Sequence, residues 1–359
     1  MPTEEKTKNK GEWSEFYTFA YLLRFGFLQA ADKDLNPIEN IRYPLVKITR
    51  EEIANKPIDY YPGENISIRK NGVEIASIPL EVFEKAVPEI FKSIKDGDKN
   101  NPPGRELMEK CLCKKVSASN SEKKDLFIQA HDPRTGQEPQ MGFSIKSYVG
   151  GPPTLFNAEK DQTNFVYDVT GCTDKIMTAV NGINDKQKKI IKRMACLTDA
   201  GCGLTYEKMA STSFYDNLIM IESRLPEILG EMIRISFLRN ILNVSELVTV
   251  MENEDPLGIG RKGFYTQKIR NFLKDVALGM TPKKKWNGEE DANGGYVAVK
   301  NDGSVVCYFV YDRVGFMDYL MAHTRLERPS TTRHEYAMIW KTIDGEYKMK
   351  LNLQVRFTD

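Results

Sequence analysis

One stretch near the middle of the chain reads as two strands joined by a short turn, and it constrains the fold more than any other. Residues 123–147, KKDLFIQAHDPRTGQEPQMGFSIKS, contain two strand-like runs around a turn with Pro and Gly. This pattern predicts an antiparallel β-hairpin. The second run carries a lysine, Lys146, among apolar neighbours. Since charged side chains are common on sheet edges, Lys146 alone does not indicate a functional site.

The register expected for this hairpin pairs the lysine with an aspartate. If the turn is centred at residues 135–136, Asp125 lies opposite Lys146. Because side chains alternate between the faces of a strand, Gln129 shares the face of Asp125 and Ser144 shares that of Lys146. Directly opposed side chains lie about 5 Å apart. The pair then forms either a plain cross-strand ion pair or part of a catalytic site.

A second aspartate, Asp132, precedes a proline in the turn. It lies seven residues beyond Asp125 in the sequence, which is roughly 23 Å along an extended strand. Asp-Pro is an ordinary turn sequence. We therefore expect Asp132 to shape the turn, and Asp125 to contribute to any site on the hairpin.

The composition is that of a globular protein. The chain has 359 residues, of which 41% are hydrophobic and 28% charged, and its formal net charge is +1. No apolar run approaches the roughly 18 residues of a transmembrane helix, and the polar N-terminus does not resemble a signal peptide. Six scattered cysteines without a CxxC pair fit a reducing compartment. We expect a cytoplasmic protein without a membrane segment.

The rest of the chain predicts an α+β fold. Amphipathic spacing indicates helices, and alternating runs around Asn-Gly or Asp-Gly indicate further hairpins. The expected elements are helices over 11–26, 80–94 and most of 184–280, hairpins over 65–80 and 295–311, and a strand over 347–357.

Six stretches of the chain, taken in order, form a further pattern. They are NKGEWSEFY (9–17), KKDLFI (123–128), GFSIKSYVGGPPTLFNA (142–158), TNFVY (163–167), GGYVAVKNDGSVVCYFVYDRVGFMDYL (294–320) and LNLQVRF (351–357). An aspartate that opens one strand, followed by x-x-Lys on the next, is similar to the motif of the PD-(D/E)XK nuclease superfamily. Within that superfamily, the ordered set of stretches resembles the HpaII-type restriction endonuclease family.

The resemblance implies a type II restriction endonuclease that cuts double-stranded DNA at a short palindrome, CCGG. It implies a mixed central β-sheet flanked by helices, with a β-rich C-terminal segment. The expected division is residues 1–110 with the first helix and hairpin, 111–280 with the nuclease core, and 281–359 for DNA recognition. A palindrome suits a two-fold homodimer, and a monomer that nicks each strand in turn fits equally. A cognate DNA methyltransferase would act on the same site without direct contact.

The resemblance also implies a Mg²⁺ site on the hairpin. Asp125 and the backbone carbonyl of Ile145 would bind the ion, and Lys146 would act on the attacking water. The superfamily motif has an acid two residues before the lysine, but this chain has Ser144, a weaker, neutral ligand. Glu15 and Glu12 on the first helix are candidates for the missing acid, although carboxylates there also suit the helix dipole.

Candidate DNA contacts follow from residue chemistry. Arginine suits guanine edges, and Asn or Gln suits adenine. The candidates are Arg325, Arg328 and Arg333 in the loop 323–334, Thr154, Asn157 and Asn164 after the catalytic strand, and Gln129 on the hairpin.

Two other functions remain open at this stage. Ser144 also fits a sequence-specific DNA-binding protein with a degenerate nuclease site. An unrelated metabolic α/β enzyme is disfavoured, because GIGRKG (258–263) does not follow a strand as a dinucleotide-binding loop would. Three dispersed histidines do not indicate a zinc site.

Overall fold

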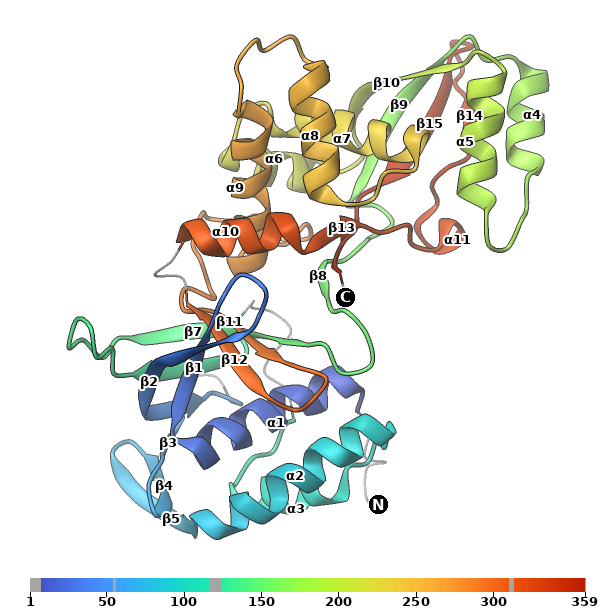
Figure 1. The fold of residues 1–359 in the computed structure, drawn as a ribbon. Helices are drawn as coiled ribbons and strands as arrows, with labels where there is room; N and C mark the ends of the chain where they lie inside the picture. Colours follow the sequence, from blue (N-terminus) through green and yellow to red (C-terminus); the bar gives the residue numbers. More distant parts are fainter. Residues whose placement is uncertain (1–7, 54–55, 117–123, 310–312, 359) are drawn as a thin grey trace. The chain divides into compact units, whose positions relative to one another are not determined.

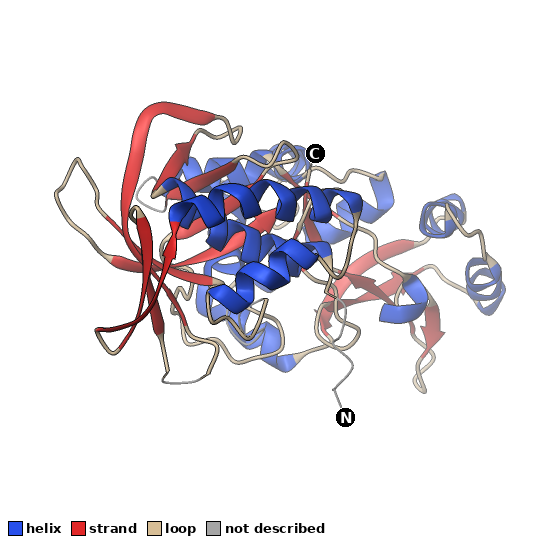
Figure 2. Cartoon of the chain, turned by 90° about the horizontal axis from the view of Figure 1, so that it is seen from below, coloured by secondary structure: helices blue, strands red, loops and turns tan. Residues whose placement is uncertain are grey.

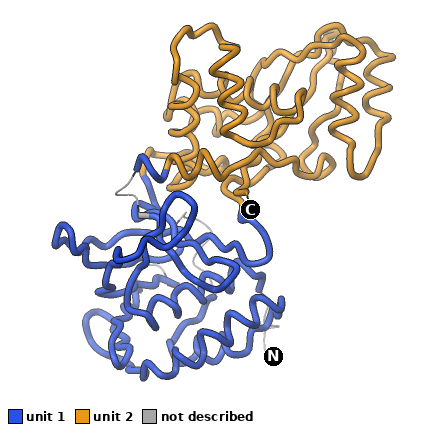
Figure 3. Tube along the Cα trace, viewed as in Figure 1, with its two compact units in different colours: residues 1–153, 290–316, 359 blue, residues 154–289, 317–358 orange. Residues whose placement is uncertain are grey.

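The computed structural model describes the chain apart from residues 1–7, 54–55, 117–123, 310–312 and 359. The chain divides into two compact units, each assembled from stretches that are separate in the sequence (Figure 3). Unit 1 comprises residues 1–153, 290–316 and 359, and unit 2 comprises residues 154–289 and 317–358.

These units cut across the three segments expected from the sequence, 1–110, 111–280 and 281–359. The hairpin with Asp125 and Lys146 belongs to unit 1, together with the N-terminal helix. The reason is strand pairing, because the two hairpin strands join a sheet built from the first segment and from the C-terminal segment. The C-terminal segment is itself divided between the two units.

Unit 1 is built on a nine-stranded mixed sheet, in the order β1-β12-β11-β7-β6-β2-β3-β4-β5 (Figure 1). β11 runs parallel to β7 and β1 parallel to β12, whereas the other neighbours are antiparallel. This arrangement confirms the predicted α+β class with a mixed central sheet. The strands are β1 (Phe27–Ala31), β2 (Pro37–Arg50), β3 (Ile58–Tyr61), β4 (Asn65–Lys70), β5 (Val73–Pro79), β6 (Leu126–Ala130), β7 (Gln140–Ser147), β11 (Gly295–Val299) and β12 (Val305–Phe309).

The first helix, α1 (Lys10–Phe25), packs against this sheet and confirms the helix expected over 11–26. Asn9 caps its N-terminus in a capping box with Glu12, and Gly26 ends it with a φ of 71°. Its apolar side chains, such as Trp13 and Phe16, are fully buried. The other helices of unit 1 gather on the same side of the sheet (Figures 1 and 2) and are α2 (Leu80–Asp96), which packs on α1, and α3 (Pro102–Lys110).

Unit 2 combines two small sheets with a set of helices. One sheet has the strand order β10-β9-β15-β14, and the other has the order β13-β16-β8. The strands are β8 (Thr154–Phe156), β9 (Asn164–Thr170), β10 (Gly203–Met209), β13 (Thr324–Leu326), β14 (Ile339–Lys341), β15 (Tyr347–Asn352) and β16 (Val355–Phe357). The helices are α4 (Asp174–Gly182), α5 (Lys189–Asp199), α6 (Thr212–Ile221), α7 (Leu225–Arg239), α8 (Val244–Glu254), α9 (Phe264–Leu278), α10 (Arg313–Ala322), which begins in unit 1, and α11 (Thr331–His334).

Most elements expected from local patterns are present. The hairpins at 65–80 and 295–311 correspond to β4–β5 and β11–β12. Two details differ from expectation. The helical region 184–280 contains the strand β10, and the closing strand over 347–357 is split into β15 and β16, which belong to different sheets.

No helix within the described ranges is both long enough and apolar enough to span a bilayer.

Gly142 gives a direct test of how β7 is held. A methyl group on Gly142 would collide with the backbone carbonyl oxygen of Asp291. The same part of the chain is bonded to Gly142, because Asn293 Oδ1 accepts a 2.8 Å hydrogen bond from Gly142 N. We expect Gly142→Ala to lower the free energy of unfolding by about 1–3 kcal/mol, because the added methyl group would overpack the space beside the Asp291 carbonyl. Urea unfolding measures this loss. Gly182→Ala is the control, since a methyl there meets no atom within 4 Å and its expected effect is close to zero.

Candidate catalytic site

The hairpin β6–β7 has a register that differs from the predicted one by two residues. Leu126 pairs with Phe143 and Gln129 pairs with Gln140, so Asp125, just before β6, lies beside Ser144. The expected pairing of Asp125 with Lys146 is therefore wrong in register. A shift of two preserves the face on which each side chain lies, because the side-chain period of a strand is two.

Asp125 is fixed to β7 through its carboxylate. The backbone N–H of Ile145 donates to Asp125 Oδ2 at 2.6 Å, and the Ser144 hydroxyl donates to the same oxygen at 3.3 Å. The Asp125 N–H donates to the carbonyl of Phe143 at 2.8 Å. A carboxylate that accepts a charge-assisted bond from the next strand is held firmly. Asp125 therefore keeps a defined position relative to the strand that carries Lys146.

Lys146 lies over the ring of Tyr296, with its Nζ 5.2 Å from the ring centroid. Tyr296 is on β11, which runs parallel to β7 and pairs Tyr296 with Ser144, and its side chain is buried. Burial lowers the pKa of Lys146, whereas the negative charges of Asp125 and Glu15 act in the opposite direction and raise it. Burial dominates, so the neutral amine is more populated than for an exposed lysine.

The two helix acids proposed from the sequence have different surroundings. Glu12 is part of the capping box, where it accepts a bond from Asn9 N at 2.9 Å and pairs with Lys8 at 3.0 Å. Glu15 lies near enough to Lys146 to raise the pKa of that lysine. A 2.8 Å hydrogen bond from Ser14 Oγ to Ser147 Oγ holds α1 against β7.

The cluster offers oxygen ligands of the kind that Mg²⁺ prefers. They are the carboxylates of Asp125 and Glu15 and the backbone carbonyl of Ile145. The described residues hold no group of three or more His, Cys, Asp or Glu side chains fit to bind a metal. Mg²⁺ does not need one, because it commonly binds through one or two carboxylates and takes further oxygens from water and phosphate. The residues therefore fit a Mg²⁺ site.

Comparison with known proteins identifies the chain's family. The model of the HpaII restriction endonuclease family matches residues 9–357. The chain is also 35% identical, over 367 residues and 99% of both chains, to the type II restriction enzyme HpaII of Haemophilus parainfluenzae. This chain belongs to the HpaII restriction endonuclease family. None of the solved structures matches it.

Family membership confirms the resemblance and the expected enzyme class, a type II site-specific deoxyribonuclease. It also removes the alternative of a metabolic α/β enzyme. The hairpin with Asp125 and Lys146 lies within the matched residues, as does the helix with Glu15.

Asp132 and Gln129 lie away from Lys146, toward the turn of the hairpin. The carboxylate of Asp132 accepts bonds from Arg134 N and Thr135 Oγ1, both at 2.9 Å, so it shapes the turn as expected. Gln129 donates to the carbonyl of Glu138 at 3.1 Å, across the same hairpin.

The candidate DNA contacts in unit 2 fall into two groups. In the first group, the side chains bond with other residues of unit 2. Arg328 donates to Asn240 Oδ1 at 2.7 Å and to the carbonyl of Ser236 at 2.9 Å. Arg325, on β13, is half-buried and pairs with Glu327 at 3.3 Å.

Asn164 also serves the fold. Its side chain is fully buried and donates to the carbonyl of His334 at 3.0 Å, while its oxygen accepts from Asn352 at 2.7 Å. A base contact from this position would require breaking the core of the unit, so we leave Asn164 out of the proposed DNA interface. Thr154 begins β8 and is half-buried.

Arg333 and Asn157 form the second group. Both are exposed, and both line one hollow of about 580 Å³ in unit 2. Lys283 and Gln354 line it too. The structure therefore brings together an arginine and two amide side chains, the residue types that read guanine and adenine edges.

Sequence reasoning missed Tyr296 and Gln354. Tyr296 lies in a hairpin that the sequence did predict, but its parallel pairing with β7 joins residues about 150 positions apart, as the Tyr296–Ser144 register shows. No local pattern carries that information. Gln354 lies between β15 and β16, within the segment read as one continuous strand.

The contribution of Glu15 to the pKa of Lys146 is measurable. We expect Glu15→Gln to lower the pKa of Lys146 further, because it removes a negative charge that raises this pKa. NMR titration of the lysine ε-methylene signals reports the shift, with Lys146→Arg used for assignment. Glu12→Gln is the control and should leave the pKa of Lys146 unchanged. An equal shift in both variants would contradict the placement of Glu15.

Proposed function

We propose that this enzyme hydrolyses phosphodiester bonds of double-stranded DNA at the palindrome CCGG in a Mg²⁺-dependent reaction. The observation that carries the proposal is the Asp125 carboxylate held at 2.6 Å from Ile145 N, one residue before Lys146, in a chain of the HpaII restriction endonuclease family. The palindrome rests on the family resemblance. The enzyme would work in the bacterial cytoplasm beside a methyltransferase that protects the same sites.

The proposed Mg²⁺ ligands are the carboxylates of Asp125 and Glu15 and the carbonyl of Ile145. When bound, the ion would polarise the scissile phosphate and favour ionisation of the attacking water. Glu15 is our choice for the second acid, in place of the carboxylate that Ser144 lacks. Its charge acts on Lys146, whereas the Glu12 carboxylate is engaged in the helix cap. Ser144 supports Asp125 through its hydroxyl.

Lys146 would take a proton from the attacking water and hold the nucleophile near the phosphate. A lysine serves as a base only where its pKa is lowered, and burial acts in that direction here. The ring of Tyr296 lies against the ammonium group and limits its movement. In its protonated form, the same lysine would stabilise the negative charge that develops on the phosphate.

Base recognition is proposed for the hollow lined by Arg333 and Asn157. Arginine is suited to bidentate contact with guanine, and CCGG presents two guanines on each strand. Because the site is palindromic, either a two-fold dimer or two successive nicks by a monomer would complete a double-strand cut.

Two substitutions test the catalytic pair. We expect Asp125→Ala and Lys146→Ala each to reduce the cleavage rate by at least about 100-fold, because they remove the metal ligand and the base. Binding of a CCGG duplex should remain measurable by fluorescence anisotropy in both variants. Full cleavage activity in either one would remove this site from consideration.

Asp132→Ala is the matched control, since it removes another carboxylate of the same hairpin. We expect it to retain most of the cleavage rate, because the carboxylate of Asp132 accepts its bonds from the turn residues Arg134 and Thr135. It should lower the free energy of unfolding by about 1 kcal/mol through the lost hydrogen bonds. A loss of cleavage as large as that of Asp125→Ala would overturn the choice of Asp125.

Sequencing the ends of plasmid fragments made in the presence of Mg²⁺ tests the whole proposal. We expect discrete fragments whose ends all map to CCGG, and no fragments when Mg²⁺ is chelated. Fragment ends at another sequence would overturn the proposed specificity. Binding to CCGG duplexes without any cleavage would favour the alternative, a sequence-specific DNA-binding protein with a degenerate nuclease site.

A further inference from the structure

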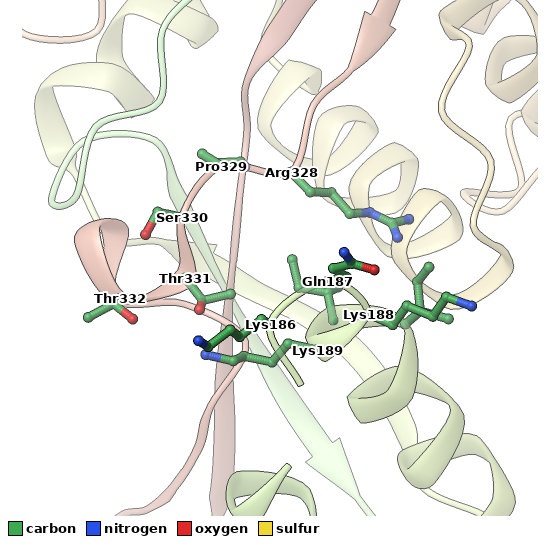
Figure 4. A pocket seen from close by; sticks show the side chains of 11 residues that line it. Lys186, Gln187, Lys188, Lys189, Arg328, Pro329, Ser330, Thr331 and Thr332 are labelled. Carbon is green, nitrogen blue, oxygen red and sulfur yellow. The ribbon is translucent and has the colours of Figure 1, made fainter. Parts of the chain in front are cut away.

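A second hollow in unit 2, of about 380 Å³, lies between the start of α5 and the segment 328–332 (Figure 4). Three lysines line it, Lys186, Lys188 and Lys189, together with the hydroxyl-bearing residues Ser330, Thr331 and Thr332. The lysines come from the turn that precedes α5 and from its first residue.

The residues that line this hollow carry positive charge. Its lining residues include no Asp or Glu. In the part of the chain that the structure describes, Lys186, Lys188 and Lys189 form no ion pair. The neighbouring acid, Asp185, is engaged with Lys192 at 2.6 Å and does not line the hollow. Clustered like charges destabilise the free protein, and an anionic partner relieves that repulsion.

The side chains are directed in a way that suits an anion. Lys186 and Lys189 extend toward the segment with Thr331, whereas Lys188 extends away from it (Figure 4). Just before α5, the carboxylate of Asp185 accepts hydrogen bonds from Gln187 N at 2.9 Å and Lys188 N at 2.7 Å, so the lysine side chains, and not the helix dipole, supply the positive charge.

The opposite wall is firmly held. Arg328 anchors the segment 328–332 to α7 through its bonds to Ser236 and Asn240, and its guanidinium lies 5.0 Å from the ring centroid of Phe237. The hollow therefore exists before any partner binds.

We propose that Lys186 and Lys189, with the hydroxyl of Thr331, bind backbone phosphates of duplex DNA next to the recognition site. The hollow shares Pro329 and Ser330 with the one that holds Arg333 and Asn157, so the two adjoin. A duplex whose base edges reach Arg333 would bring its backbone to the lysines. This inference rests on the proposed DNA-cleaving function and adds the surface that binds the flanking duplex.

Salt dependence of binding tests the proposal, because each phosphate contact releases counterions. The full-length protein, wild type and Lys186→Ala/Lys189→Ala, is titrated without divalent metal into a CCGG duplex and a duplex of scrambled sequence. We expect the slope of log K against log salt to become shallower by about 1.8, at about 0.9 for each contact. Affinity at ~0.1 M salt should fall by roughly 60-fold, the effect of that slope over one decade of salt, and equally for both duplexes, since phosphate contacts carry no sequence information.

Arg261→Ala/Lys262→Ala is the matched control. It removes the same charge from an exposed part of unit 2 that does not line the hollow. An unchanged slope in Lys186→Ala/Lys189→Ala, or an equal change in the control, would overturn the proposal. Plasmid cleavage by the wild type is scored separately, so a failure of the proposed nuclease function is distinguished from a failure of this contact.

Discussion

The hydrogen bond from the Ile145 N–H to the Asp125 carboxylate, at 2.6 Å, is the contact on which the proposed catalytic cluster depends. A neutral donor paired with a carboxylate gives a strong bond, worth about 1.5–3 kcal/mol. This bond fixes Asp125, which lies just before β6, to β7, the strand that carries Lys146. The relative position of Asp125 and Lys146 is therefore fixed by a direct bond to β7, in addition to the register that the turn around Asp132 sets.

A second constraint acts on Lys146. Its ammonium group lies against the ring of Tyr296, in a setting where burial lowers its pKa. Keeping a lysine there costs stability, and the charges of Asp125 and Glu15 offset part of that cost. A loss of stability of this kind is common at functional sites, which agrees with the role proposed for Lys146. Helix α1 brings Glu15 to this point, held to β7 by the Ser14–Ser147 bond.

Local patterns in the sequence predicted the hairpins, the first helix, the α+β class and the face shared by Asp125 and Lys146. They did not predict the register of the β6–β7 hairpin, which is offset by two residues from the expected one. Hydrogen bonds within the loop from Asp132 to Gln137 close the turn, and the sequence pattern does not reveal them. Local patterns also missed Tyr296, whose pairing with β7 is long-range. They did not show that Asn164 is buried, because polarity alone does not separate a surface contact from a buried hydrogen-bonded amide. The division into units follows from strand pairing between distant segments, which composition does not reveal.

We infer that Glu15 supplies the acid that Ser144 cannot. Single-turnover cleavage rates in Mg²⁺ for Glu15→Gln, Glu12→Gln and the double variant Glu15→Gln/Ser144→Asp test this inference. We expect a loss of at least about 100-fold for Glu15→Gln, a rate close to wild type for Glu12→Gln, and partial recovery in the double variant. A wild-type rate for Glu15→Gln, or an equal loss for Glu12→Gln, would contradict it.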